Sequence, residues 1–213
     1  RPSSVGTKSA TIIIANNDSD ENPYNFAITG TGTQPDMTVL GNTITINNND
    51  ITPNTADFSD FGDARTDGQT VTRTFSIENN GTADLNISLP VTISGTAAAD
   101  FSVNVQPAAT VAPGGSTSFQ VTFDPSAIGN RDAAISFSSD DIDDPNFSFA
   151  ITGNGIQPDM TVLGNTVTIS NNDITPSAAD FSDFGDARTD GQTVIRTFSI
   201  ENNGTADLNI SLP

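Results

Sequence analysis

An internal repeat of 123 residues organises the sequence. Residues 158–213 align without a gap on residues 35–90, and five of the 56 pairs differ (positions 44, 47, 54, 55 and 72), which leaves 51 identical. The same offset aligns residues 1–34 with residues 124–157, and 14 of these 34 pairs are identical. Repeats of this kind are structural units that stack on their neighbours. We therefore expect one complete module at 35–157, the last part of a preceding module at 1–34 and the first part of a following module at 158–213.

Apolar and polar residues alternate along several short stretches, as in strands with one buried face. The alternating apolar residues are Leu85, Ile87, Leu89; Phe101, Val103, Val105; Phe119, Val121, Phe123; Ala133, Ile135, Phe137; and Phe147, Phe149, Ile151. Turn sequences separate them, such as NNGTAD at 79–84 and APGG at 112–115. Strands are predicted at about 36–46, 70–77, 84–89, 100–105, 117–123, 132–138 and 146–152. This pattern predicts an all-β fold of tandem Ig-like antiparallel β-sandwich modules.

One basic residue interrupts the apolar pattern. Arg73 has the inward parity of Val71, Phe75 and Ile77. Because an unpaired buried guanidinium is costly, we expect Arg73 at the mouth of its strand or paired with an acid.

The composition excludes several function classes. With 26 acidic and 7 basic residues, the chain has a net charge of −19, which repels nucleic acid and anionic lipid. No apolar run is long enough for membrane insertion. The absence of Cys and His excludes thiol nucleophiles, zinc sites and Ser–His–Asp chemistry. A small sandwich with acids on its turns has no expected deep cleft for carboxylate catalysis, so we expect no enzyme.

Several motifs resemble a known family. DFGDARTDGQTVTRTFSIENNGTADLNI begins at residue 60, SVNVQPAATVAPGGSTSFQVTFDPSAIGNRDAAISFSSDD begins at residue 102, and FAITGNG begins at residue 149. In this order they are similar to the bacterial choice-of-anchor D repeats, relatives of the abnormal-spindle and hydin type (ASH) Ig-like domains. The resemblance implies an Ig-like sandwich in long, secreted or cell-surface bacterial proteins, usually without assigned catalysis. It implies no particular functional residues.

Two acidic loops occupy equivalent positions in the repeat. NNDSDEN at 16–22 aligns with residues 139–145, which overlap the acidic loop SSDDIDD at 138–144 in all but its first residue. Although 20 of the 34 aligned positions differ, Asp18 matches Asp141, Asp20 matches Asp143, and Glu21 matches Asp144 as a carboxylate. In an Ig topology, stacking modules head to tail sets this loop against the long connection 47–68 of the module before it. Acidic groups are then expected to face each other across the joint.

Apposed carboxylates repel unless a cation lies between them, and Ca²⁺ prefers carboxylate and amide oxygens. We therefore predict calcium sites at the acidic loops and the long connection. The candidate ligands are Asp18, Asp20, Glu21, Asn22, Asp140, Asp141, Asp143, Asp144, Asp50, Asp57, Asp60, Asp63 and Asp67. Disulfides are impossible and the one Lys is Lys8, so calcium remains as the means of stiffening an array. The alternative is that these residues simply form polar turns.

The leading functional hypothesis is a structural segment of a long extracellular or cell-surface bacterial repeat protein: a fibre, adhesin stalk or biofilm matrix filament stiffened by calcium. Its expected partners are neighbouring modules and other copies of the protein. A carbohydrate- or protein-binding adhesin module without structural metal is the alternative. The chain has no Trp and one Tyr for a sugar-binding platform, and strand exchange between subunits remains a second route to a filament.

Overall fold

The computed structural model describes residues 2–211 and is built almost entirely of β-strands. The strands are β1 (Gly6–Ile14), β2 (Tyr24–Gly32), β3 (Met37–Gly41), β4 (Ile44–Ile46), β5 (Asp60–Arg65), β6 (Val71–Asn79), β7 (Leu85–Ser94), β8 (Phe101–Val105), β9 (Thr110–Val111), β10 (Ser116–Phe123), β11 (Gly129–Ser139), β12 (Asn146–Ile156), β13 (Met160–Gly164), β14 (Val167–Ile169) and β15 (Phe198–Asn202). One 3₁₀ turn, η1 (Ala98–Asp100), precedes β8. In the described part of the chain, no helix has the length and apolar character of a membrane span.

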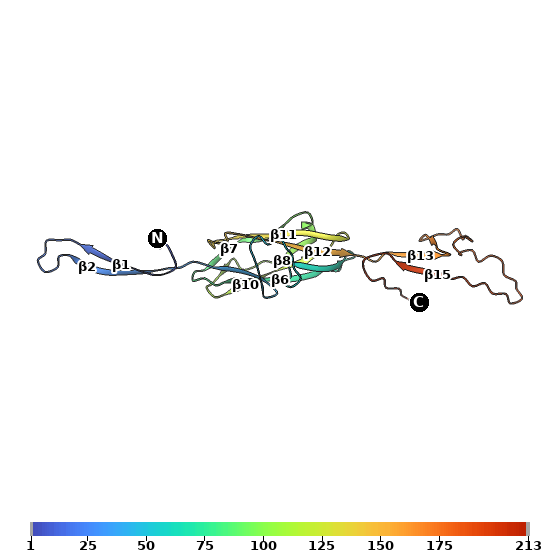
Figure 1. Ribbon diagram of the computed structural model, residues 1–213, viewed down its shortest axis with the longest axis horizontal. Coiled ribbons are helices and arrows are strands. Elements are labelled where there is room, and N and C mark those ends of the chain that lie inside the picture. Colours follow the sequence, from blue (N-terminus) through green and yellow to red (C-terminus); the bar gives the residue numbers. More distant parts are fainter. Residues whose placement is uncertain (1, 212–213) are drawn as a thin grey trace. The chain divides into compact units, whose positions relative to one another are not determined.

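The complete module is a sandwich of two five-stranded sheets. One sheet has the order β4-β3-β6-β10-β8, and the other has the order β5-β12-β11-β7-β9. Figure 1 shows β6, β8 and β10 in one layer and β7 and β11 in the other. This arrangement confirms the predicted Ig-like β-sandwich.

Aromatic side chains from both sheets fill the space between the layers. Phe75 and Phe119 stack with their ring centroids 5.3 Å apart, and Phe75 also contacts Phe149 of the opposite sheet at 5.4 Å. Phe61 lies 5.3 Å from Phe101, edge to face. Apart from Phe61, these rings lie at inward positions of the alternating pattern, and burial of this face drives the strands together.

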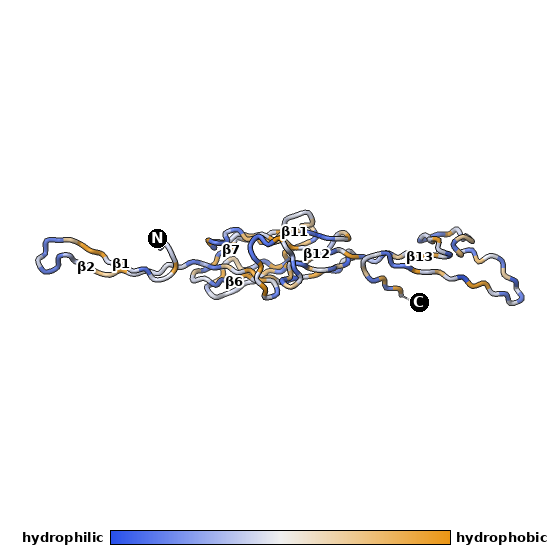
Figure 2. Tube along the Cα trace, viewed as in Figure 1, coloured by the Kyte–Doolittle hydropathy of each residue, from blue (hydrophilic) through white to orange (hydrophobic). Residues whose placement is uncertain are grey.

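Two flanking segments repeat parts of this sandwich. β1 pairs with β2 from Gly6↔Gly32 to Ile14↔Tyr24, and the pair is equivalent to β11 and β12. The strands β14-β13-β15 form a sheet that repeats β4-β3-β6, since Met160↔Asn202 corresponds to Met37↔Asn79. In Figure 2, most of the loop between β1 and β2 is hydrophilic. The local structure therefore recurs at the offset of the sequence repeat.

The described chain divides into two compact units. The first extends to Gly62 and includes Val71–Phe123 and Arg131–Gly153. The second includes Asp63–Thr70, Asp124–Asn130 and the residues from Asn154 onward. Each joint between modules lies within one unit: the joint around Gln34 is in the first and the joint around Gln157 is in the second.

Two details of the predicted strands are wrong. The stretch 36–46 is a hairpin of β3 and β4, because Asn42 and Thr43 adopt the positive φ angles (49° and 66°) of a tight turn. The connection 47–68 contains the strand β5 at the edge of the second sheet.

Arg73 is paired differently from the expectation. Its guanidinium lies 4.5 Å from the centroid of the Phe58 ring, and its Nη2 donates to the carbonyl of Phe61 at 3.4 Å. Arg196 has the same position over Phe181 in the following copy. A cation–π contact therefore accommodates the half-buried arginine in place of an ion pair.

Candidate functional site

The acidic loop at residues 139–145 is tied into its own module by its carboxylates. Asp141 is buried, and its two oxygens accept hydrogen bonds from the backbone N–H of Met37 at 2.6 Å and of Asp143 at 3.1 Å. Asp140 accepts from both the backbone N–H and the Nδ2 of Asn86, each at 2.8 Å. Asp144 accepts from Asn48 Nδ2 at 2.8 Å. The loop thus fixes the start of β3 and the start of β7.

The equivalent loop at residues 15–23 has the same local turn without the tie to a following strand. The backbone N–H of Asp20 points to Asp18 Oδ1 at 3.4 Å, as that of Asp143 does to Asp141. Hydrogen bonding with Asp20 lowers the pKa of the Asp18 carboxyl. Asn16 closes the loop, with its Nδ2 donating to the carbonyl of Glu21 and its N–H to Asn22 Oδ1. The matched Asp positions therefore share a turn geometry.

The acids of the long connection stabilise turns in the same way. Asp50 Oδ1 accepts from the hydroxyl of Thr52 at 2.6 Å and from its N–H at 2.9 Å, and the hydroxyl is the main reason that the pKa of Asp50 is lowered. Asp57 accepts from the N–H and hydroxyl of Ser59. Asp60 accepts from the N–H of Gly62 at 2.8 Å. These three carboxylates satisfy turn amides.

Among residues 2–211, no group of three or more acidic side chains lies close enough together to hold a metal ion. The predicted sites need the acidic loop of one module and the long connection of the module before it. This sequence contains one of these two segments at each joint: the loop 139–145 near Gln34, and the connection near Gln157. Calcium binding therefore stays a prediction.

The first joint is held by backbone hydrogen bonds that sequence reasoning did not predict. The carbonyl of Gln34 accepts from the N–H groups of Thr82 at 2.8 Å and Ala83 at 3.2 Å. The carbonyl of Asp36 accepts from the N–H of Asn80 at 2.7 Å. The linker between modules is thereby fixed to the turn at residues 79–84, which we call the β6–β7 turn.

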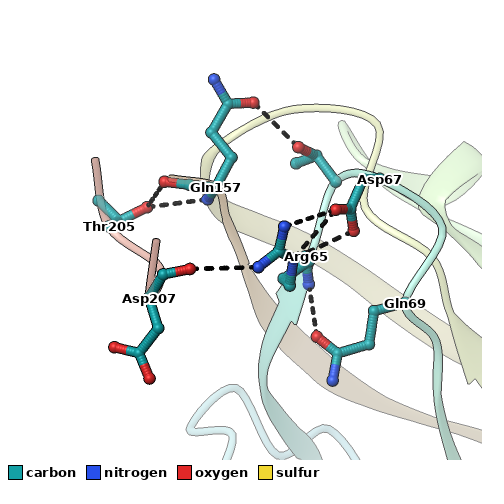
Figure 3. A network of polar contacts seen from close by, with 7 residues as sticks. Arg65, Asp67, Gln69, Gln157, Thr205 and Asp207 are labelled. Carbon is teal, nitrogen blue, oxygen red and sulfur yellow. Dashed lines mark hydrogen bonds and ion pairs between the residues drawn. The ribbon is translucent and has the colours of Figure 1, made fainter. Parts of the chain in front are cut away.

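The second joint repeats these bonds 123 residues later. The carbonyl of Gln157 accepts from the N–H groups of Thr205 at 2.8 Å and Ala206 at 3.1 Å, and that of Asp159 accepts from Asn203 at 2.7 Å. Figure 3 shows Gln157 beside Thr205. The two copies of the joint thus have corresponding hydrogen bonds of nearly equal length.

A glycine in the β6–β7 turn permits the close approach of the linker. A Cβ on Gly81 would lie 2.5 Å from both the nitrogen of Asp36 and the carbonyl oxygen of Gln34. A Cβ on Gly204 would lie 2.3 Å from the carbonyl oxygen of Gln157. Because these neighbours are backbone atoms, they cannot move aside as a flexible side chain would.

Asn79 organises the turn from inside the sandwich. Its Nδ2 donates to the carbonyls of Ala83 at 2.8 Å and Val111 at 2.9 Å, and its Oδ1 accepts from the N–H groups of Gly81 and Asp36. The side chain is fully buried with all of these bonds made. Its inward parity with Phe75 and Ile77, in place of an apolar residue, was the sequence signal that could have identified it.

Side chains from the preceding module complete the second joint (Figure 3). Thr66 Oγ1 donates to Gln157 Oε1 at 3.0 Å. Arg65 forms an ion pair with Asp67 at 2.7 Å and donates from Nη1 to the carbonyl of Asp207 at 3.3 Å. The hydrogen bonds between them lower the pKa of Asp67 and raise the pKa of Arg65. Asp63 lies nearby in the same unit and accepts from Asn154 Nδ2 at 2.8 Å.

Comparison with known proteins gives a family match for the central part of the chain. Residues 51–154 match the model of the HYDIN/CFA65/VesB-like Ig-like domain, and this stretch lies inside the module at 35–157. No curated protein matches the chain at a significant level.

Solved structures with a related arrangement are remote in sequence. A protein of unknown function from Porphyromonas gingivalis W83 is 18% identical, with a TM-score of 0.42 over 72% of this chain and 68% of that one. The secreted serine protease VesC from Vibrio cholerae is 17% identical, with a TM-score of 0.37 over 47% of this chain and 22% of VesC. The ASH / PapD-like domain 7 of human CEP192 is 16% identical, with a TM-score of 0.36 over 58% of this chain and 87% of that domain.

Proposed function

We propose that this chain, whose residues 51–154 belong to the HYDIN/CFA65/VesB-like Ig-like domain family, is a structural segment of a long extracellular bacterial repeat protein. The family match also confirms the resemblance to ASH-type Ig-like domains. In this proposal the modules are spacers in a fibre, adhesin stalk or matrix filament at the cell surface. The partner of each module is the next module along the chain, and other copies of the protein are the further partners expected in a filament.

The observation that supports this proposal is the recurrence of one joint at two places in the chain. The carbonyl of Gln34 accepts two N–H bonds from the β6–β7 turn, and that of Gln157 accepts two from the equivalent turn at residues 202–207. A free linker of polar residues would behave as a flexible coil, whereas a linker whose carbonyls are bonded to the next module is restrained. Successive modules in an array therefore inherit one preferred joint conformation, as a spacer requires.

Calcium at the acidic loops adds to the stiffness in this proposal. The loops carry carboxylate and amide oxygens, and the strongly negative chain gains from any cation that reduces repulsion between modules. The backbone bonds at the joint act independently of this contribution.

The joint is tested by making the linker longer. Inserting a short Gly-Ser segment between Gln157 and Pro158 adds flexible residues between β12 and the following module, and the same insertion between Asp18 and Ser19 is the control in an exposed loop. Small-angle X-ray scattering should give a broader distribution of dimensions for the joint variant than for the wild type or the control. A wild-type chain as flexible as the joint variant would refute the spacer role.

A further inference from the structure

The basic residues of the joint carry a second inference, which rests on the proposed spacer function. Arg65 and Arg188 are equivalent residues, and each forms an ion pair of 2.7 Å with an Asp two positions later, Asp67 or Asp190. The N–H of each arginine also donates to a Gln side chain four residues on, at 3.0 Å. The loop conformation and the ion pair are therefore properties of the loop itself.

The two copies of this loop differ in what covers the arginine. The Arg65 side chain is 31% exposed and the Arg188 side chain is 78% exposed, whereas both aspartates are 58% exposed. Arg65 has in addition the hydrogen bond from Nη1 to the carbonyl of Asp207, in the turn of the following copy. The guanidinium is thus the part of the preformed loop that contacts the next module.

The acceptor is suited to a guanidinium. The carbonyl of Asp207 closes the turn whose N–H groups at Thr205 and Ala206 are bonded to Gln157. The Asp207 carboxylate adds an attractive charge that contributes to the raised pKa of Arg65. Asp67 aligns the planar fork of the guanidinium by binding its Nε and Nη2, which leaves Nη1 free to reach across the joint (Figure 3).

The complete module presents the same acceptor surface on its own turn. Asp84 is equivalent to Asp207, and two residues later Asn86 binds the Asp140 carboxylate through both of its N–H donors. An arginine of the module before, bound at the Asp84 carbonyl, would therefore lie next to the acidic loop at residues 139–145. The charge of that loop favours an arginine on the module before it.

We propose that Arg65, oriented by Asp67, is a clamp that recognises the β6–β7 turn of the following copy of the module and fixes the orientation of the joint. The partner surface is the carbonyl end of the turn. For Arg65 this is the carbonyl of Asp207, and the equivalent carbonyl in the complete module is that of Asp84. Because Lys is a point charge without the planar fork, it cannot bind Asp67 through two nitrogens and the Asp207 carbonyl through a third.

Hydrogen exchange of the amides of Thr205 and Ala206 in the 213-residue chain tests the clamp. Arg65→Gln should speed their exchange about two- to five-fold, the range expected for an exposed ion pair. Arg188→Gln is the matched control, since it removes the same charge and the same type of ion pair away from this joint, and it should leave these amides unchanged. Arg65→Lys should exchange nearly as fast as Arg65→Gln.

The outcomes separate the clamp from the spacer role. Suppose that the Thr205 and Ala206 amides are protected in the wild type. If their exchange rates then change equally in Arg65→Gln and Arg188→Gln, or in neither variant, the clamp is overturned and the spacer role stands. Amides that exchange freely in the wild type overturn both. High salt should bring the wild type to the rate of Arg65→Gln while changing that variant little, because salt screens an exposed pair; equal salt responses contradict the clamp.

Discussion

At the scale of single residues, the joint depends on a position where no side chain fits. Gly81→Ala would place a Cβ 2.5 Å from backbone atoms of Gln34 and Asp36, which forces the linker away from the turn. We expect a loss of about 1–3 kcal/mol in the free energy of unfolding, as for other overpacked sites, with faster exchange of the Thr82 amide. Urea denaturation and hydrogen exchange measure these effects. Gly30→Ala is the control, since a Cβ there meets no atom within 4 Å, and equal losses in both variants would contradict the role of Gly81.

Asn79 is the second residue on which the turn depends. Asn79→Ala leaves the buried carbonyl of Val111, the part-buried carbonyl of Ala83 and the N–H of Gly81 without their side-chain partner. Because unsatisfied buried groups keep their full desolvation cost, we expect a loss of about 2–4 kcal/mol. The midpoint of urea denaturation should fall accordingly. Asn80→Ala, whose exposed side chain has one bond to Thr38, should cost much less, and a similar loss in the two variants would argue against a special role of Asn79.

The Arg65–Asp67 pair gives a pH dependence with a defined sign. The pKa of Asp67 is lowered in the folded chain, chiefly by its hydrogen bond with Arg65. The pair therefore stabilises the joint above the unfolded pKa of about 3.9, and the contribution is lost as the pH falls through the lowered folded pKa. A carbon NMR titration of the Asp67 carboxyl should give a midpoint below about 3.9, and Arg65→Gln should raise it. Identical midpoints in the two proteins would exclude the ion pair in solution.

At the scale of strands and loops, alternation predicted most of the sandwich and failed inside an irregularity of β7. Leu85 and Ile87 are buried as predicted, but the register of β7 on β11 shifts between Ser136 and Ser138. Residues 89–91 of β7 lie opposite the single residue Phe137, so β7 has two extra residues there. Leu89 is exposed within this irregularity, whereas Val91 is buried with the same parity as Leu85 and Ile87. Alternation read from sequence alone cannot place such a bulge, because the extra residues are visible only in the pairing of two strands.

The edge strand β5 was missed for a related reason. Its buried residues Phe61 and Ala64 are three positions apart, since Gly62 between them has a φ of +75°. The pattern of a strand with one buried face is therefore absent from the sequence DFGDAR. The linker bonds were also unpredictable, because their acceptors are backbone carbonyls, which leave no trace in residue type; the inward parity of Asn79 marks only the turn that donates to them.

The acidic loops were identified correctly as equivalent elements, and the two copies now provide a test of their role. Asp141→Asn replaces an oxygen that accepts from a backbone N–H by an NH₂ group, so either the buried amide of Met37 or the part-buried amide of Asp143 loses its partner. We expect a loss of about 1–3 kcal/mol without added metal, whereas Asp18→Asn in the exposed loop should have little effect. Thermal denaturation in metal-free buffer measures the difference, and no loss in Asp141→Asn would leave ligand chemistry as the reason for this residue.

At the scale of the whole molecule, the net charge of −19 is a repulsive field that every joint must overcome. The linker bonds and the Arg65 clamp act locally, and each counters a small part of that field. We predict that Ca²⁺ binds the loops at residues 16–22 and 140–144 with a dissociation constant of about 10⁻³ M, at the weak end of the range for extracellular modules, because each loop here lacks the long connection of the module before it. NMR titration with CaCl₂ should then shift the signals of these two loops, and EDTA should reverse the shifts. The melting temperature should rise more with CaCl₂ than with NaCl at matched ionic strength, because a coordinated ion stabilises the folded state beyond screening. Equal effects of the two salts, without shifts confined to the loops, would show that calcium acts on this chain only by screening its charge.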